Sequence, residues 1–290
     1  MSTRTLPSLF VSHGSPMLAL EPGAAGAFMQ TLGPAIDAAF GRPRAVVVSS
    51  AHSLTREPVL LAAPRHETVH DFGGFPDALY QLRYDAPGGD SLAPRVAQGV
   101  RDAGLPVHVV PDGGLDHGIW VPLRYIYPGV DVPVLPLAFP PDWSPQQLFQ
   151  LGRALAPLRD DGVLVMGSGS ITHNLRMVFS RRAHDRTAAD DEPEMAESAA
   201  FRRWFVERST AGDHEALFDY RRQAPHATLM HPTDEHLLPW YVAAGAGHEG
   251  PAVRIHDSVT VGCLGMDAYA FGANAPKLAP RLARTEAAPA

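Results

Sequence analysis

Five histidines follow short apolar runs or open the next segment, where α/β enzymes often keep their reactive groups. Imidazole is the commonest metal ligand in proteins, and its unperturbed pKa lies near neutrality, so histidine also serves as an acid or a base. A single histidine taken alone is more often a surface or core residue, but these five share one kind of position. The pattern therefore predicts a metal-binding or acid/base cluster made of His13, His52, His117, His173 and His236, out of 14 histidines in all.

The segments between these histidines indicate which elements must position them. Short apolar runs of the kind found in strands buried on both faces occupy residues 8–11, 45–50, 132–137 and 163–166. Apolar residues spaced three and four apart predict helices over 91–103 and 144–158, the second opening with Ser144 as N-cap and Pro145 at the first helical position. The charged stretch 181–197 is predicted to be a loop leading into a helix around 194–208.

Strands and helices in alternation predict an α/β fold, a single domain with a mostly parallel central sheet flanked by helices. We assign residues 1–275 to one catalytic domain, because no linker divides them, and residues 276–290 to a disordered tail rich in Ala, Pro and Arg. The carboxyl ends of parallel strands lie at one edge of a sheet. We therefore expect His13, His52 and His173 to converge although they are far apart in the sequence.

The other two histidines lie in motifs of their own. Asp116 precedes His117 and is predicted to orient an imidazole by accepting its hydrogen bond. Thr233 is predicted to cap a helix that carries His236 at its third position. On a helix, the adjacent Glu235 and His236 would point about 100° apart, so only one of them would face a shared metal.

Composition excludes several other classes of protein. A net charge of −7 argues against nucleic-acid binding, and no apolar run reaches 18 residues, so no membrane span is expected. The N-terminus lacks the pattern of a secretory signal, and the single cysteine, Cys263, fits a reducing compartment, so a cytoplasmic location is expected. The run Gly167-Ser168-Gly169-Ser170 has no following lysine, which excludes a phosphate-binding P-loop. Neither Ser15 nor Ser170 lies in the Gly-x-Ser-x-Gly elbow of serine hydrolases.

Six motifs, in order, resemble one known family. They are Ser12-His13-Gly14-Ser15-Pro16, Ser50-Ala51-His52, His70-Asp71-Phe72-Gly73-Gly74-Phe75-Pro76, Asp116-His117-Gly118-Ile119-Trp120, His173-Asn174-Leu175 and Pro232-Thr233-Asp234-Glu235-His236-Leu237-Leu238-Pro239. Over about residues 6–270 the chain is similar to the DOPA 4,5-dioxygenase family of the class III extradiol ring-cleavage dioxygenases. One position departs from the pattern: many relatives have a tryptophan after the second ligand, where this chain has Ser53.

The resemblance implies a role for each histidine. His13, His52 and His236 would bind the metal, although the wider superfamily uses a glutamate as third ligand, which keeps Glu235 as a competitor. His173 would be the acid/base catalyst or a further ligand in a resting form. His117 would act on substrate or bound oxygen.

The resemblance also implies a cofactor and a reaction. The cofactor would be one non-haem divalent metal per chain, Fe(II) for dioxygenase chemistry, while three imidazoles and an open position also suit Zn(II). The substrates would be O2 and a small aromatic diol, a DOPA-like catechol whose ring is cleaved. Two alternatives use the same histidines: a zinc-dependent hydrolase and a non-catalytic metal-binding relative of the same fold.

Overall fold

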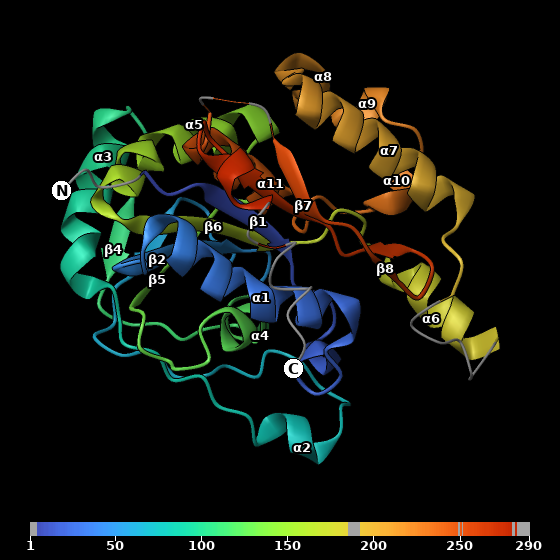
Figure 1. Cartoon of the computed structure of the whole chain (residues 1–290), viewed down its shortest axis with the longest axis horizontal. Helices are drawn as coiled ribbons and strands as arrows, with labels where there is room; N and C mark the ends of the chain where they lie inside the picture. Colours follow the sequence, from blue (N-terminus) through green and yellow to red (C-terminus); the bar gives the residue numbers. More distant parts are fainter. Residues whose placement is uncertain (1–4, 185–191, 249, 251, 280–281, 283–290) are drawn as a thin grey trace.

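The centre of the molecule is a β-sheet with helices on both faces (Figure 1). The structure is a computed structural model and describes residues 5–184, 192–248, 250, 252–279 and 282. Its strands are β1 (Ser8–Ser12), β2 (Ala45–Ser50), β3 (Val59–Leu61), β4 (His108–Val110), β5 (Val134–Ala138), β6 (Val163–Gly169), β7 (Val253–His256), β8 (Val259–Thr260), β9 (Leu264–Gly265) and β10 (Ala268–Phe271). Its helices are α1 (Gly23–Phe40), α2 (Asp77–Tyr80), α3 (Ala93–Asp102), α4 (His117–Ile126), α5 (Pro145–Leu155), α6 (Leu175–His184), α7 (Ala196–Ala211), α8 (His214–Phe218), α9 (Tyr220–Gln223), α10 (Ala227–Met230) and α11 (Leu238–Ala246).

The main sheet has the strand order β4-β3-β5-β2-β6-β1-β10-β7 over the described residues, and β8 pairs with β9 separately. Its centre is parallel, because β6 pairs in parallel with both β1 and β2, and β2 with β5. Antiparallel pairs join β3 to β5, β1 to β10 and β10 to β7. The predicted α/β fold with a mostly parallel central sheet is confirmed.

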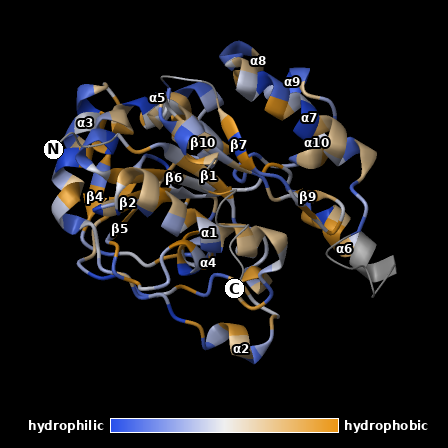
Figure 2. Ribbon diagram, in the orientation of Figure 1, coloured by the Kyte–Doolittle hydropathy of each residue, from blue (hydrophilic) through white to orange (hydrophobic). Residues whose placement is uncertain are grey.

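The central strands are buried on both faces because their successive apolar side chains enter two different cores. In β2, Val47 packs in the core under α3, α5 and α11, whereas Val46 and Val48 pack in the core under α1 and α4. This alternation follows from the two-residue period of a strand. It explains why unbroken runs such as residues 45–48, apolar at every position, occupy the middle of the sheet (Figure 2).

The predicted elements match the structure closely, with shifts at their ends. The N-cap at Ser144 is confirmed: its hydroxyl accepts the backbone N–H of Gln147, and the Gln147 side chain accepts the N–H of Ser144 in return. Helix α5 ends at Leu155, and the chain continues as a 3₁₀ helix over Ala156–Asp161.

Two predictions for the C-terminal half differ in part from the structure. The predicted loop at 181–197 was wrong at its start, because helix α6 runs on to His184, and residues 185–191 lie outside the described residues. The predicted tail, 276–290, also lies largely outside them, but Leu278 and Leu282 are buried in the core under α1 and α4.

A buried ion cluster attaches α7 to the strands that end beside the predicted site. Arg202 of α7 is buried, and its Nε donates to Oδ2 of the fully buried Asp267 at 2.7 Å. Its Nη1 also reaches both carboxylate oxygens of Glu194 at 2.9 Å. The carbonyl of Asp267 accepts the backbone N–H and the hydroxyl of Ser12, the residue before His13. The cluster therefore extends from α7 to the end of β1.

Substituting Arg202→Ala is expected to lower the free energy of unfolding by about 3–5 kcal/mol, because Asp267 would remain buried without its main partner. Chemical denaturation of the full chain measures this. The matched control is Arg222→Ala, which removes an 82% exposed side chain and a single surface ion pair to Asp219, and which should change stability by less than about 1 kcal/mol. Equal losses of unfolding free energy in the two variants would show that the buried cluster stabilises the fold no more than a surface ion pair does.

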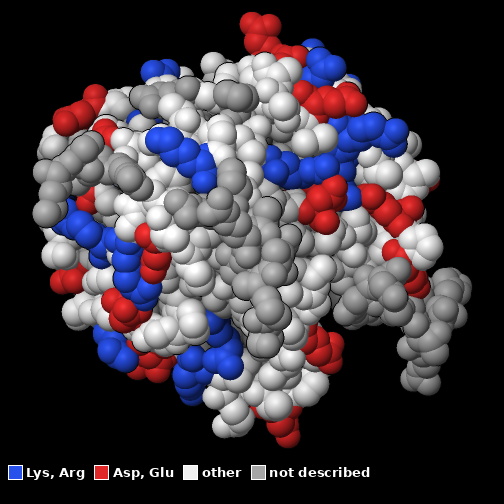
Figure 3. Space-filling model, in the orientation of Figure 1, with Lys and Arg blue, Asp and Glu red and all other residues white. Residues whose placement is uncertain are grey.

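The surface carries charges of both signs. In the face drawn in Figure 3, acidic and basic side chains are interleaved and do not gather into one basic patch. Within the described residues, no helix is both long enough and apolar enough to cross a membrane.

Candidate active site

The predicted convergence of His13, His52 and His173 is confirmed by the order of the strands. His13 directly follows β1, His52 follows β2 by two residues, and His173 follows β6 by four. These three strands are neighbours in the sheet, with β6 in the middle, and they run in parallel. Their carboxyl ends therefore place the three imidazoles at one edge, where His117 at the first turn of α4 and His236 before α11 join them.

The five rings form one compact cluster. Nε2 of His13 lies 3.1 Å from Nε2 of His52. The distances between ring centroids are 5.3 Å for His13–His117, 5.5 Å for His13–His236, 4.0 Å for His52–His117, 5.0 Å for His52–His236 and 3.4 Å for His173–His236. His13, His117 and His236 are buried, while His52 and His173 are half-buried, and the side on which these two rings reach solvent is the opening of the cluster.

Hydrogen bonding determines which nitrogen of His13 carries the proton. The Ser168 hydroxyl donates to the carbonyl of Gly118, so it can only accept from Nδ1 of His13, which lies 3.0 Å away. Nδ1 of His13 is therefore protonated, and its Nε2 presents a lone pair to the cluster.

Asp71 determines the same tautomer for His117. Its Oδ2 lies 2.9 Å from Nδ1 of His117 and 3.6 Å from Nδ1 of His52. A carboxylate only accepts, so Nδ1 of His117 carries the proton and its Nε2 presents a lone pair, whereas the longer distance to His52 is an electrostatic contact. The prediction that Asp116 orients an imidazole was wrong: its carboxylate accepts the hydroxyls of Ser50 and Ser53, both at 2.6 Å.

His236 lies in a turn and not on a helix, so the predicted cap at Thr233 was wrong. The Thr233 hydroxyl donates to the Glu235 side chain, and α11 begins only at Leu238. The turn rests directly on β6, because a Cβ at Gly169 would lie 2.0 Å from the carbonyl oxygen of His236. That carbonyl accepts the backbone N–H of Ser170 at 2.8 Å. Gly169 therefore admits the His236 turn, and Gly167 likewise admits the carbonyl of Pro239 at the start of α11, 2.1 Å from where a Cβ would lie.

Glu235 and His236 differ in what they contribute. Oε1 of Glu235 lies 3.1 Å from Nδ1 of His236 and therefore accepts its proton, which leaves Nε2 of His236 as the donor atom. The structure also places His173, Glu235 and His236 within metal-binding reach of one another, as it does His13, His52 and His117. Two imidazoles, those of His117 and His236, therefore lie close enough to His13 and His52 to supply the third ligand of a shared metal.

These rings suit a divalent metal ion. Burial, and then the neighbouring imidazoles, lower the pKa of His52 to about 4 and hold the pKa of His13 and His236 well below its usual value. All three are therefore neutral near pH 7, the form that coordinates metal. The Nε2 atoms of His13 and His52 lie 3.1 Å apart, close enough to share a proton or to bind one cation together. With the other donor atoms within reach, the arrangement suits a metal site.

His173 differs from the other four. Burial and the nearby His117 lower its pKa to about 4, while Glu235 opposes the shift. Its ring stacks on that of His236 at 3.4 Å with an angle of 8° between the planes. In the part of the chain that the structure describes, no hydrogen bond holds either nitrogen of this ring. A neutral imidazole at the opening, with nothing bonded to it, can accept a proton from a bound molecule.

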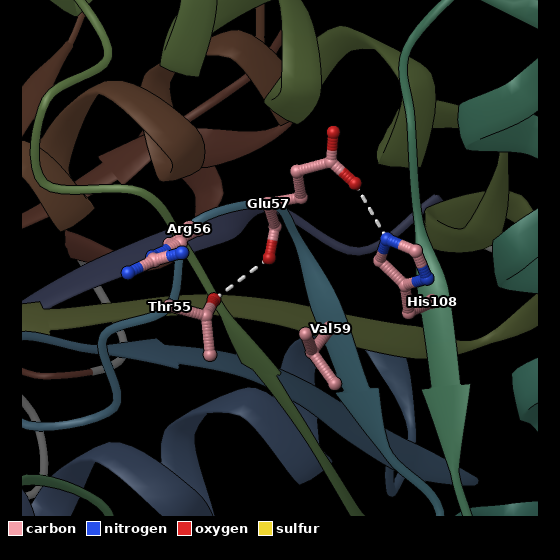
Figure 4. A pocket seen from close by; sticks show the side chains of 5 residues that line it. All are labelled: Thr55, Arg56, Glu57, Val59 and His108. Atoms are coloured by element: carbon pink, nitrogen blue, oxygen red, sulfur yellow. Dashed lines mark hydrogen bonds and ion pairs between the residues drawn. The ribbon is translucent and has the colours of Figure 1, made fainter.

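A second hollow lies elsewhere on the surface. An open depression of about 500 Å³ at the outer strands β3 and β4 is lined by Thr55, Arg56, Glu57, Val59 and His108 (Figure 4). Its one ion pair joins Glu57 to His108 at 2.5 Å, and both side chains are more than half exposed. The hollow is separate from the histidine cluster and lacks its convergent buried nitrogens.

Comparison with known proteins agrees with this geometry. The model of the catalytic LigB subunit of aromatic ring-opening dioxygenase matches residues 7–272, so the chain belongs to that family. The chain is 36% identical to a 4,5-DOPA dioxygenase extradiol of Beta vulgaris over 91% of its own length and 96% of the relative's. It is 34% identical to the protein of that name in Escherichia coli (strain K12), over 94% and 97%.

A solved structure shows the same fold. The crystal structure of an uncharacterized Escherichia coli K12 protein superposes with a TM-score of 0.72 at 29% identity, covering 92% of this chain and all of that one. The fold, the histidine cluster and the family together define a metal-binding protein of the ring-opening dioxygenase class.

Proposed function

We propose that the chain is an extradiol dioxygenase that uses O2 to cleave the ring of a small catechol, of which DOPA is one candidate. The observation that carries the proposal is the convergence of neutral imidazoles, with the Nε2 atoms of His13 and His52 3.1 Å apart. Beside them, at the opening, lies the His173 ring, whose nitrogens make no hydrogen bond to the described residues. A half-buried Phe72, whose ring lies edge-on to His117 at 5.7 Å, offers an aromatic wall next to the cluster.

In this proposal His13, His52 and His236 hold one divalent metal through their Nε2 atoms. Three imidazoles leave coordination positions open, and bound Fe(II) would bring both catechol oxygens and dioxygen together and supply the redox chemistry. The same donors suit Zn(II), which can occupy such a site during purification. His236 is favoured over Glu235 because the carboxylate of Glu235 is engaged by Nδ1 of His236 and by Thr233.

The proton steps fall to the remaining two histidines. His173 removes a proton from a catechol hydroxyl as the substrate binds and returns it when the ring opens. Nδ1 of His117 carries the proton that it donates to Asp71. Its Nε2 therefore presents a lone pair to the cluster and can accept a hydrogen bond from an oxygen-bound proton.

Replacing His173→Ala is expected to keep the metal and to reduce turnover by about 10²- to 10⁴-fold, the usual contribution of a positioned general base. Metal content by atomic emission and the rate of oxygen uptake measure the two effects. His108→Ala, which removes an exposed imidazole in the distant hollow of Figure 4, is the matched control and should behave as wild type. Wild-type turnover in the His173 variant would remove this residue from the mechanism.

The proposed activity itself is tested by metal exchange. The protein is stripped of metal and reloaded without oxygen with Fe(II) or Zn(II), and oxygen uptake and yellow ring-fission product are then followed across a catechol panel that includes DOPA. Oxygen consumption and product with iron alone support the dioxygenase. Ester or amide hydrolysis with zinc and without oxygen would indicate a zinc hydrolase, and silence at full metal occupancy a non-catalytic relative.

A further inference from the structure

One carboxylate contacts two of the five imidazoles. Oδ2 of Asp71 lies 2.9 Å from Nδ1 of His117 and 3.6 Å from Nδ1 of His52, and Oδ1 accepts the backbone N–H of His117 at 2.8 Å. We propose that Asp71 is a positioning residue that sets the orientation and the tautomer of the His117 ring by hydrogen bonding and orients the nearby His52 ring by electrostatic attraction to its Nδ1 side. The inference rests on the proposed function, in which His52 binds the metal and His117 faces the substrate.

The chain places Asp71 opposite α4 through a short parallel pairing. Val69 donates its N–H to the carbonyl of Leu115 at 2.8 Å, and Leu115 donates its own to the carbonyl of Glu67 at 2.9 Å. The paired residues are Thr68 and Leu115; Asp71 follows Thr68 by three residues and His117 follows Leu115 by two, so their side chains meet beyond the pairing. The backbone pairing therefore determines where the Asp71 side chain, which is 22% exposed, approaches the cluster.

Asp71, and not the N-cap residue Asp116, accepts a hydrogen bond from the first backbone N–H of helix α4. Asp116 is the N-cap residue of α4, but its side chain makes no capping hydrogen bond. Asp71 instead supplies a carboxylate to the first N–H of that helix, where negative charge is favourable. The backbone N–H and the Nδ1–H of His117 thus both donate to this one carboxylate.

One carboxylate close to two rings has a consequence for the reaction. The rings of His52 and His117 lie 4.0 Å apart, and the Asp71 carboxylate lies near the Nδ1 atoms of both. Losing it frees His117 to carry its proton on Nε2, which disorders the group that faces the substrate, and it removes the negative charge beside His52, which weakens metal binding by that ring. A single side chain thus governs one predicted metal ligand and one predicted catalytic residue.

The test is Asp71→Asn in the full chain. An amide of the same shape keeps one acceptor but places an N–H₂ group against the imidazoles. Zinc affinity, measured by competition with a chromophoric chelator, should fall about 10- to 100-fold. The ¹⁵N spectra of the zinc-loaded protein, labelled at histidine, should lose the Nδ1–H signature of His117. Neither readout requires turnover, so absence of catechol cleavage would refute the proposed function without touching this inference.

Asp116→Asn is the matched control, because Asp116 is a buried carboxylate of the same site that accepts only the hydroxyls of Ser50 and Ser53. It should leave both imidazole tautomers as in wild type. Equal zinc affinity in wild type and Asp71→Asn, or equal loss in both variants, would overturn the proposal. Should Asp71→Asn fail to fold, the wild-type spectrum decides: His117 protonated at Nε2 and bare at Nδ1 would contradict the proposal.

Discussion

His13→Ala is expected to abolish oxygen uptake and to weaken metal binding by about 10²- to 10³-fold. Structural zinc sites with four ligands are worth about 10–16 kcal/mol, so one imidazole accounts for about 3 kcal/mol or more. His13 is almost fully buried and directly follows strand β1, so its imidazole is held in place by the fold and its removal takes one donor atom from the site. Zinc competition and metal content after dialysis measure the loss.

The same measurement decides the third ligand. If His236 completes the site, His236→Ala will lose the metal as His13→Ala does, and His117→Ala will keep it. Both residues are near enough to be the third ligand, because the ring centroid of His117 lies 4.0 Å from that of His52 and the ring centroid of His236 lies 5.0 Å from it. Metal retained in His236→Ala and lost in His117→Ala would assign the ligand set to His13, His52 and His117 and would exchange the two roles.

The second large effect is expected from a glycine that makes no contact of its own with metal or substrate. In Gly169→Ala the new Cβ would lie 2.0 Å from the carbonyl oxygen of His236 and 3.1 Å from its carbon. A backbone group cannot rotate away as a flexible side chain does, so the His236 turn must move outward by about 1 Å and lose the hydrogen bond from Ser170. Misplacement of that size can reduce turnover about 10²-fold, and overpacking costs about 1–3 kcal/mol.

Zinc affinity, oxygen uptake and the thermal midpoint Tm of Gly169→Ala should therefore all fall together. The control is Gly73→Ala, because a Cβ at Gly73 meets no atom within 4 Å, and its Tm and zinc affinity should equal those of wild type. A wild-type zinc affinity in Gly169→Ala would mean that the turn carrying His236 is not held in place by β6.

The sequence by itself determined the central fold and much of the site. Runs such as 45–48 are apolar at successive positions, which is typical of a strand covered on both faces, and the alternation with helices predicted the parallel sheet. The sequence predicted that the residues after such parallel strands converge at one edge, and the structure shows that β1, β6 and β2 are neighbours. This order brings His13, His52 and His173 together from segments up to 160 residues apart.

Only the tertiary structure decided how these groups are held. Asp71 and Asp116 are both carboxylates near site histidines in the sequence, and nothing local shows which of them accepts from an imidazole. The answer depends on the pairing of residues 67–69 with Leu115, a contact between distant segments. Gly169 likewise has no function visible in its own neighbourhood, because the backbone that needs its missing side chain belongs to His236. The spacing of apolar residues predicts local geometry, whereas imidazole tautomers and close backbone contacts depend on residues that the fold brings together from distant parts of the chain.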